Sequence, residues 1–108
     1  MKSIYISLPI SGNEDDYEQR LDEAVAYVKK NVPEYEYIIT PKEIAERLED
    51  YKTMKPKYKD YLLADMEAIA HCDAILMCHN WFKSKGCFAE RAFAGAIGLT
   101  ILYQRNFI

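Results

Sequence analysis

The sequence predicts an α/β protein in which four parallel strands form one sheet with helices on both faces. Short runs of β-branched and aromatic residues alternate with segments whose apolar residues recur at helical spacing. One run, Ala74–Cys78, is apolar without interruption, as in strands of a parallel sheet that are covered on both faces. Right-handed crossovers between such strands favour the strand order 2-1-3-4.

The first half of the chain contains two predicted strands and two predicted helices. Lys2–Leu8 has the composition of a strand and is followed by a Pro- and Gly-containing turn. Helical spacing of apolar residues begins after Asn13, which is a good N-cap residue. Tyr35–Ile39 is the second predicted strand. A helix is then expected from Pro41 through Leu48, because proline is favoured in the first turn.

The second half repeats this alternation after a polar connection over residues 50–57. A helix is predicted to start near Pro56, and the apolar strand Ala74–Cys78 follows it. A polar and aromatic loop then leads to a last helix, Gly86–Ile97, and to a last strand, Thr100–Tyr103. These elements together predict a flavodoxin-like or Rossmann-like three-layer sandwich.

The composition is that of one ordinary folded domain. The chain has 108 residues, of which 50% are hydrophobic and 29% are charged, and this excludes disordered and low-complexity classes. No internal repeat and no linker divides the sequence, so residues 1–108 are expected to form a single domain.

Charge and hydropathy exclude several classes of partner. Fourteen basic and 17 acidic residues give a net charge of −3, whereas a nucleic-acid polymer or an anionic membrane would require a basic excess. No apolar run approaches the roughly 18 residues of a membrane span, and the start of the chain is too poor in apolar residues for a secretory signal. We therefore expect a cytoplasmic protein.

The three cysteines predict buried, reduced thiols. Cys72, Cys78 and Cys87 cannot all pair within one chain, and they form neither a C-x-x-C motif nor a zinc spacing with nearby histidines. We therefore expect no metal site. Cys87 opens the predicted last helix, where a thiolate would be stabilised, so a phosphate-ester or redox enzyme built on Cys87 remains a lower-ranked alternative.

In doubly wound sheets, ligands bind beyond the carboxyl ends of the strands, where the winding reverses. Here that crevice is expected between the first and third strands. The turn over residues 8–13 and the loop over residues 79–86 would face each other across it.

Glu90 is the most informative polar residue near this crevice. From the start of the last helix to the end of the last strand, Glu90 and Arg91 are the only charges, and a helix that apolar is expected to be covered on most sides. Glu90 shares a face with Phe93 and Ile97, and it lies in the first turn, where the helix dipole favours an ionised carboxylate. The alternative is an acid that caps the helix or meets a cation from elsewhere.

Asp65 is the second candidate, because it stands four residues from both Tyr61 and Ile69 on the inward face of its helix. An acid on a packing face needs a partner, or its pKa rises and it becomes a proton donor. One ionised and one protonated acid are what retaining glycosyl transfer requires. The alternative is an Asp65 that only hydrogen-bonds a backbone turn.

Four further features complete the predicted crevice. Tyr5 would present its hydroxyl there from the first strand, and the Ser11-Gly12 turn lies close by. Trp81, with Phe82, offers a flat surface for a base or sugar, or else a lid over the core edge. Ser84 begins the last helix, where backbone amides suit an anion or a hydroxyl group, although it would also serve only as an N-cap.

These residues fall in stretches that resemble nucleoside 2-deoxyribosyltransferase-like proteins, most closely the small phage- and bacterium-associated branch whose own activity is often unassigned. The stretch Ile4–Gly12 is similar to the opening YI-x-x-P-I-x-G of that superfamily. The second half is similar in Asp65-Met66-x-x-Ile69-x-x-Cys72-Asp73-Ala74 and in Trp81-x-x-Ser84-x-Gly86-x-x-x-Glu90-x-x-x-Ala94-x-x-x-Gly98. The resemblance covers roughly half of the chain, and residues 32–57 add nothing to it.

The resemblance implies an enzyme that cleaves or transfers the N-glycosidic bond of a nucleoside or nucleotide without a cofactor. Glu90 would attack C1′ of the sugar, Asp65 would protonate or bind the departing base, and Tyr5 would orient the nucleophile. Water or a second base would then accept the sugar. The implied substrate-binding residues are Pro9, Ile10, Ser11, Gly12, Trp81, Ser84 and Gly86.

The sequence also departs from the family pattern. Leu8 stands where relatives usually have glycine, and Pro9 replaces a phosphate-binding serine, which argues against a required 5′-monophosphate. The main alternative to the enzyme is a non-catalytic nucleotide-binding module with the same fold, which keeps the pocket but does no turnover. A homodimer or larger homo-oligomer is also expected, since Trp81, Phe82 and the apolar last helix present more hydrophobic surface than so small a sheet covers.

Overall fold

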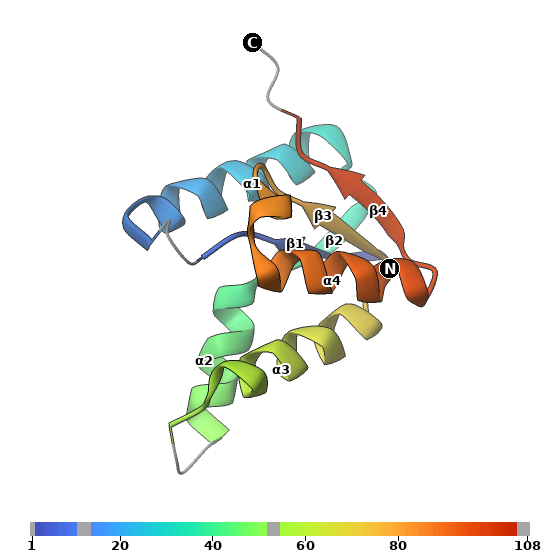
Figure 1. Ribbon diagram of the computed structural model, residues 1–108. Helices are drawn as coiled ribbons and strands as arrows, with labels where there is room; N and C mark the ends of the chain where they lie inside the picture. The colour runs from blue at the N-terminus through green and yellow to red at the C-terminus, as the bar shows by residue number, and fades with distance from the viewer. Residues whose placement is uncertain (1, 11–13, 52–54, 106–108) are drawn as a thin grey trace.

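The computed structural model describes residues 2–10, 14–51 and 55–105 of the chain. Four parallel strands form one sheet in the order β2-β1-β3-β4, so the predicted strand order is confirmed (Figure 1). Their bounds are β1 Lys2–Ser7, β2 Tyr35–Ile39, β3 Ala74–Met77 and β4 Thr100–Tyr103. The central strand β1 pairs with β2 on one side and with β3 on the other.

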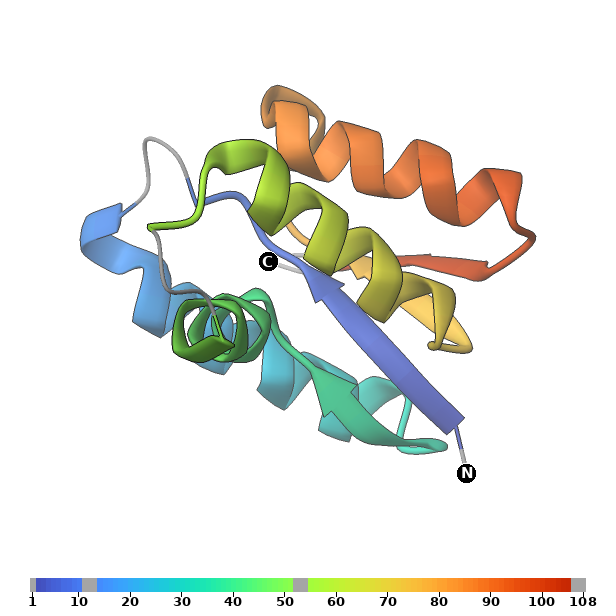
Figure 2. The same ribbon diagram turned by 90° about the horizontal axis from the view of Figure 1, so that it is seen from below.

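Helices cover both faces of the sheet, as expected for a flavodoxin-like or Rossmann-like sandwich (Figures 1 and 2). Helix α1 packs alone on one face, and α2, α3 and α4 pack on the other. Their bounds are α1 Tyr17–Asn31, α2 Pro41–Tyr51, α3 Tyr58–Ala70 and α4 Lys85–Ala96, and two 3-10 turns are η1 Glu14–Asp16 and η2 Trp81–Lys83.

The alternation of side chains along β1 divides the interior into two cores. Ile4 and Ile6 point toward α1, where they pack with Leu76 of β3. Tyr5 points to the opposite face and packs with residues of α2, α3 and α4. Because Ser7 follows Tyr5 by two residues, the α4 side of the sheet receives a buried hydroxyl at the carboxyl end of β1.

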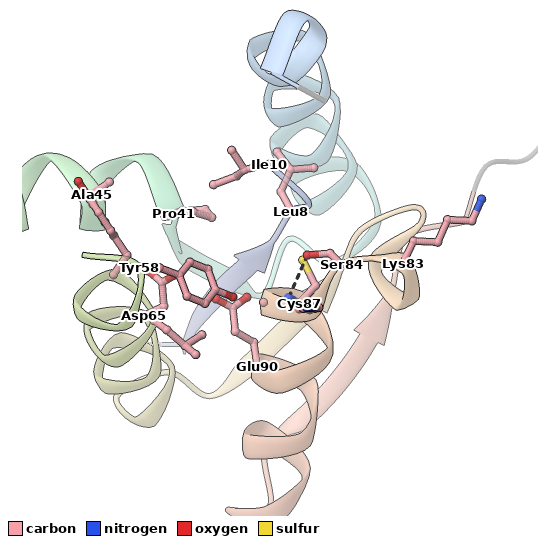
Figure 3. A pocket seen from close by; sticks show the side chains of 14 residues that line it. Leu8, Ile10, Pro41, Ala45, Tyr58, Asp65, Lys83, Ser84, Cys87 and Glu90 are labelled. Carbon is pink, nitrogen blue, oxygen red and sulfur yellow. Dashed lines mark hydrogen bonds between the residues drawn. The ribbon is translucent and has the colours of Figure 1, made fainter. Parts of the chain in front are cut away.

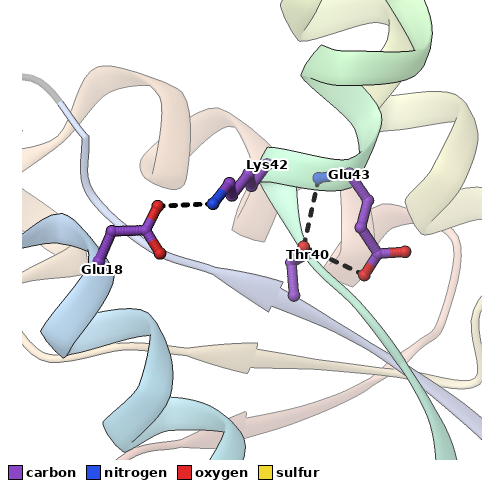
Figure 4. Close-up of polar contacts among 4 residues, drawn as sticks. All are labelled: Glu18, Thr40, Lys42 and Glu43. Atoms are coloured by element: carbon purple, nitrogen blue, oxygen red, sulfur yellow. Dashed lines mark hydrogen bonds and ion pairs between the residues drawn. The ribbon is translucent and has the colours of Figure 1, made fainter.

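Helix α2 begins as its sequence predicts. The Thr40 hydroxyl accepts a hydrogen bond from the Glu43 backbone amide at 3.3 Å and donates to a Glu43 carboxylate oxygen at 3.1 Å (Figure 4). One residue beyond Pro41, the Lys42 ammonium lies 2.7 Å from a Glu18 carboxylate oxygen and links α2 to α1. Both of these charged side chains are largely exposed, so this ion pair contributes little stability.

The structure differs from the predicted elements at the start of α1 and in the loop after β3. The α-helical part of α1 begins at Tyr17, after the turn η1, and the proposed N-cap Asn13 lies outside the described residues. The loop after β3 was expected to be irregular, but it contains η2, which follows Asn80 in a left-handed conformation with φ 66°. Among the described helices, none combines the length and apolar character needed to cross a membrane.

Candidate active site

The carboxyl end of β1 opens into a cavity of about 500 Å³, a size typical of small-molecule sites. Its walls come from the segment that follows β1, from α2 and α3, and from the start of α4 (Figure 3). The cavity is lined by Leu8, Ile10, Pro41, Ala45, Tyr58, Tyr61, Leu62, Asp65, Lys83, Ser84, Lys85, Gly86, Cys87 and Glu90.

Glu90 lies at the base of this cavity with both carboxylate oxygens held. It is only 5% exposed and belongs to the buried stripe of α4 together with Cys87 and Ala94. The Tyr5 hydroxyl donates a hydrogen bond to Oε2 at 3.2 Å, and the Ser7 hydroxyl donates to Oε1 at 2.7 Å. Two donors from β1 therefore fix the position of a carboxyl that is carried by α4.

Asp65 lies on α3 and lines the same cavity, and Figure 3 shows Asp65 and Glu90 on neighbouring helices around one space. Burial raises the pKa of Asp65 to about 6, although hydrogen bonding with Glu90 and Tyr5 lowers it in part. The sequence placed Asp65 on the inward face of its helix, and the structure brings it together with Glu90 and Tyr5. The adjacent Glu67 is exposed to solvent.

The ionisation of Glu90 is the first correction to the sequence-based interpretation. The helix dipole was expected to keep this carboxyl charged, but Glu90 lies beyond the first turn of α4, where that prediction had placed it. Burial and the nearby Asp65 charge raise the pKa of Glu90 to about 8. A dipole effect is worth roughly 0.3–1 kcal/mol near a surface, and desolvation of a buried carboxylate exceeds it. Near neutral pH the pair of acids therefore holds one proton.

The partners of Glu90 argue against the alternative in which this acid only caps the helix or pairs with a cation. Its described partners are two hydroxyl groups and a second carboxyl, rather than a cation. Two carboxyls with raised pKa values at the base of a cavity are typical of acid–base or nucleophilic chemistry.

Ser7 is a site residue that the motif analysis did not single out. It is completely buried and makes the shorter of the two hydrogen bonds to Glu90. The sequence carries a signal for it, because Ser7 is a polar residue on the same strand face as Tyr5, at the carboxyl end of an otherwise apolar strand.

The structure bears on only some of the predicted substrate-binding residues. Ile10, Ser84 and Gly86 line the cavity, and a Cβ on Gly86 would lie 3.4 Å from the Tyr58 hydroxyl oxygen. Pro9 is buried and does not line it. The remaining two residues of that turn, at positions 11 and 12, lie outside the described part of the chain.

Nearly the whole chain matches one protein family. Residues 2–103 match the model of a family described as a domain of unknown function, DUF4406. The chain belongs to this family. No curated protein matches it, so the chemistry of this DUF4406 domain has to be inferred from the site itself.

Trp81 lies outside the cavity of this DUF4406 domain, which corrects its expected role as a surface for the base. Its ring stacks on Phe88 at 5.8 Å between centroids and meets Phe82 edge-on at 6.0 Å. The Arg91 guanidinium lies 5.6 Å from the Trp81 ring centroid and hydrogen-bonds the Tyr103 hydroxyl at 2.9 Å. These contacts place Trp81 in an aromatic cluster, and its ring also packs against the core on the α4 side of the sheet. This is the lid over the core edge that the sequence offered as the alternative.

Ser84 has the capping role that was the alternative to ligand binding. Its hydroxyl accepts a hydrogen bond from the Cys87 backbone amide at 3.2 Å, as Figure 3 shows, and it also lines the cavity. Both functions are compatible, because a serine hydroxyl that accepts one hydrogen bond can still donate to a ligand.

The cysteines are free and buried, as the sequence predicted. Burial raises the pKa of the Cys87 thiol, even though the thiol lies at a helix start with Ser7 and Ser84 nearby. This result argues against Cys87 as a thiolate nucleophile. Within the described ranges, no three His, Cys, Asp or Glu side chains come together as metal ligands would.

Part of the cavity wall comes from a segment in which the motif analysis found nothing. Pro41 and Ala45 of α2 line one side, and Tyr61 and Leu62 of α3 continue it. These residues give the cavity an apolar and aromatic lining, and Figure 3 shows Pro41 and Ala45 across the cavity from Ser84 at the start of α4. A flat, weakly polar group is the kind of ligand part that such a surface accepts.

Proposed function

We propose that the protein cleaves or transfers the N-glycosidic bond of a nucleoside or nucleotide, with Glu90 as the nucleophile and Asp65 as the acid–base residue. The observation that carries this proposal is that Asp65 and Glu90 line one cavity of about 500 Å³, where burial raises the pKa of both carboxyls. The resemblance to nucleoside 2-deoxyribosyltransferase-like proteins assigns the same two residues.

The cavity suggests how such a substrate lies. The base would pack on the apolar side formed by Ala45, Tyr61 and Leu62, and the sugar would reach the polar start of α4. C1′ of the sugar then lies over the Glu90 carboxyl, and the base nitrogen faces Asp65. This arrangement places a nucleophile and a proton donor on the two partners of the bond that breaks.

The reaction proceeds in two steps. In the first, the electron pair of the C1′–N bond leaves with the base, which takes the proton from Asp65, while a Glu90 oxygen bonds to C1′. In the second, water or a nitrogen of another base attacks C1′, and the ester electrons return to Glu90. Asp65 accepts the proton of the attacking group. The chemistry needs neither a metal nor a redox cofactor.

Tyr5 and Ser7 favour the protonation state that the first step requires. Both donate hydrogen bonds to Glu90 and so stabilise its ionised form. Positive charge that develops on the sugar adds to this stabilisation and moves the shared proton onto Asp65. A cytoplasmic location belongs to the proposal, because free nucleosides and nucleotides are found there.

One observation favours the alternative, a nucleotide-binding module without turnover. Burial raises the pKa of Glu90 to about 8, so in the ligand-free protein Glu90 is largely protonated at neutral pH and is a poor nucleophile. The same cavity would then bind a nucleoside without breaking its glycosidic bond.

Base release from a panel of substrates distinguishes the two functions. The protein is incubated with ribo- and deoxynucleosides and their monophosphates, and free base is measured by chromatography, with and without a second base as acceptor. We expect release that Glu90→Gln abolishes and that Glu67→Gln, a change of an exposed carboxylate on α3, leaves unchanged. Saturable binding without release would support the binding module, and release that depends on Cys87 would revive the thiol alternative.

A further inference from the structure

The mouth of the cavity is formed in part by Tyr58, the first residue of α3. Its side chain is 63% exposed, whereas Glu90 at the base of the same cavity is 5% exposed. One side of the Tyr58 ring therefore lines the cavity, and the other side faces solvent. A substrate that enters from solvent passes this ring before it reaches the carboxyl pair.

The Tyr58 side chain reaches from α3 toward the first turn of α4. Its hydroxyl oxygen lies 3.4 Å from the place that a Cβ on Gly86 would occupy, and Figure 3 shows the side chain directed toward the start of α4. Because glycine has no side chain, the hydroxyl can approach the α4 backbone there. One aromatic side chain thus spans the two helices that carry Asp65 and Glu90.

Tyr58 differs in its freedom from Tyr61, another tyrosine that lines the cavity. The Tyr61 hydroxyl donates a hydrogen bond to a Glu49 carboxylate oxygen at 3.0 Å, which ties α3 to α2. The Tyr58 hydroxyl has no hydrogen-bond partner within the described part of the chain. The backbone at this end of α3 is held, because the Lys57 amide donates to an Asp60 carboxylate oxygen at 2.8 Å. Tyr58 can therefore turn about its side-chain bonds while α3 stays in place.

We propose that Tyr58 covers the cavity and thereby favours a second base over water as the acceptor of the sugar, an inference that rests on the proposed function. In that function the base lies against α2 and α3, and the sugar lies at the start of α4. Because the Tyr58 side chain runs from α3 toward Gly86, it lies over the bond between base and sugar. With the ring in place, bulk water has restricted access to C1′.

The two acceptors respond differently to such a ring. A free base is flat and gains from stacking on an aromatic side chain, whereas a water molecule gains nothing from it. In the second step a nitrogen of the base bonds to C1′, the ester bond breaks with its electrons returning to Glu90, and Asp65 accepts the proton of the acceptor. Water reacts through its oxygen with the same balance. Tyr58 is therefore a specificity-determining residue that favours transfer over hydrolysis.

The ratio of transfer to hydrolysis tests this role. The protein is incubated with each nucleoside of the panel and a different free base, and the new nucleoside and the free sugar are both measured by chromatography. Tyr58→Ala should lower the ratio of new nucleoside to free sugar by roughly threefold to tenfold, as expected for one lost aromatic contact. Tyr58→Phe keeps the ring and should keep most of the ratio. Leu63→Ala removes an exposed side chain of α3 that does not line the cavity, and should leave the ratio unchanged.

Alkylation of Cys87 tests the cover without any turnover. This thiol lines the cavity and is 3% exposed. N-ethylmaleimide should modify it several-fold faster in Tyr58→Ala than in the wild type or in Leu63→Ala, as measured by mass spectrometry of the peptide that contains Cys87. Modification of Cys72, which does not line this cavity, reports general loosening of the protein and should stay unchanged.

The two measurements separate the inference from the function on which it rests. No base release, together with faster Cys87 alkylation in Tyr58→Ala, would refute the glycosidic chemistry and still support the cover. Base release in which the wild type forms no new nucleoside, or in which Tyr58→Ala leaves the ratio unchanged, would overturn the role of Tyr58 in the choice of acceptor. Equal Cys87 alkylation rates in Tyr58→Ala and the wild type would overturn the cover itself.

Discussion

The Ser7 hydroxyl lies 2.7 Å from Oε1 of Glu90 and joins the end of the central strand to the first turns of α4. Ser7 is completely buried, and Glu90 is only 5% exposed where it lines the cavity. A hydroxyl that donates to a carboxylate favours the ionised form. Ser7 therefore opposes the effect of burial, which raises the pKa of Glu90.

Ser7→Ala should reduce turnover by roughly tenfold to a hundredfold, because a hydrogen bond to a charged group is worth about 1.5–3 kcal/mol. The pKa of Glu90 should rise further, so the alkaline limb of the pH–rate profile should move to higher pH. Both are measured by base release as a function of pH. Ser3→Ala is the matched control, since Ser3 lies at the opposite end of β1 and hydrogen-bonds Asp73. Equal losses in the two variants would indicate a structural role for Ser7.

The pH dependence of kcat/KM should be bell-shaped. The active form of the free enzyme holds one proton on the Asp65–Glu90 pair. Activity is therefore expected to fall at pH values below about 6, where the pair gains a second proton, and at pH values above about 8, where the pair loses its last proton. Asp65→Asn should remove the alkaline limb, because the variant has no shared proton to lose, and should keep an acid limb that reports protonation of Glu90. A wild-type profile that is flat across this range would contradict the shared-proton mechanism.

Asp65→Asn should also stabilise the protein at alkaline pH. The pKa of Glu90 is about 8 in the folded protein, compared with an ordinary value of 4.5. The folded state therefore holds this proton more tightly than the unfolded state, and the stability present below pH 4.5 is lost as the pH rises to about 8. Removal of the Asp65 charge lowers the pKa of Glu90 and reduces that loss.

Thermal unfolding of this variant measures the effect. Above pH 8 or so, the melting temperature of Asp65→Asn should exceed that of the wild type by roughly 5 °C. At acidic pH the two proteins should differ little, because Asp65 and Glu90 of the wild type are then both protonated. Glu67→Gln changes an exposed carboxylate on the same helix and should have no such pH-dependent effect. An alkaline melting temperature below that of the wild type would contradict the repulsion between Asp65 and Glu90.

The fold could be predicted from the sequence because its main signals are local. The uninterrupted apolar run of β3 indicates a buried parallel strand, and the alternation along β1 divides the two cores. The sequence did not predict the 3-10 turn η1 before α1 or the 3-10 turn η2 after β3, and both were missed for the same local reason. A 3-10 turn spans only three residues and has no periodicity that a sequence pattern would show.

The site could be predicted only in part. Glu90 and Asp65 stand out because charged residues on apolar helix faces are visible in a sequence. The prediction that Glu90 is ionised was wrong, because the desolvation that raises its pKa depends on the tertiary packing of α3, β1 and α4. The sequence left two roles open for Trp81, because a loop sequence does not show which way its aromatic rings turn, and the structure has the lid over the core edge. The place of Ala45 in the cavity wall could not be predicted, because alanine is common on the inner faces of helices in any protein core.

Ala45→Phe tests whether α2 forms the wall against which the base packs. The larger side chain would fill the apolar side of the cavity and leave the Asp65–Glu90 pair in place. KM for the nucleoside should therefore rise by roughly tenfold while kcat changes little, as expected when a contact common to ground and transition states is lost. Ala70→Phe introduces the same change at an exposed position of α3 and should leave KM unaffected. If Ala45→Phe instead lowered kcat at unchanged KM, the base would have to lie elsewhere in the cavity, and α2 would act on the reacting atoms rather than on the bound base.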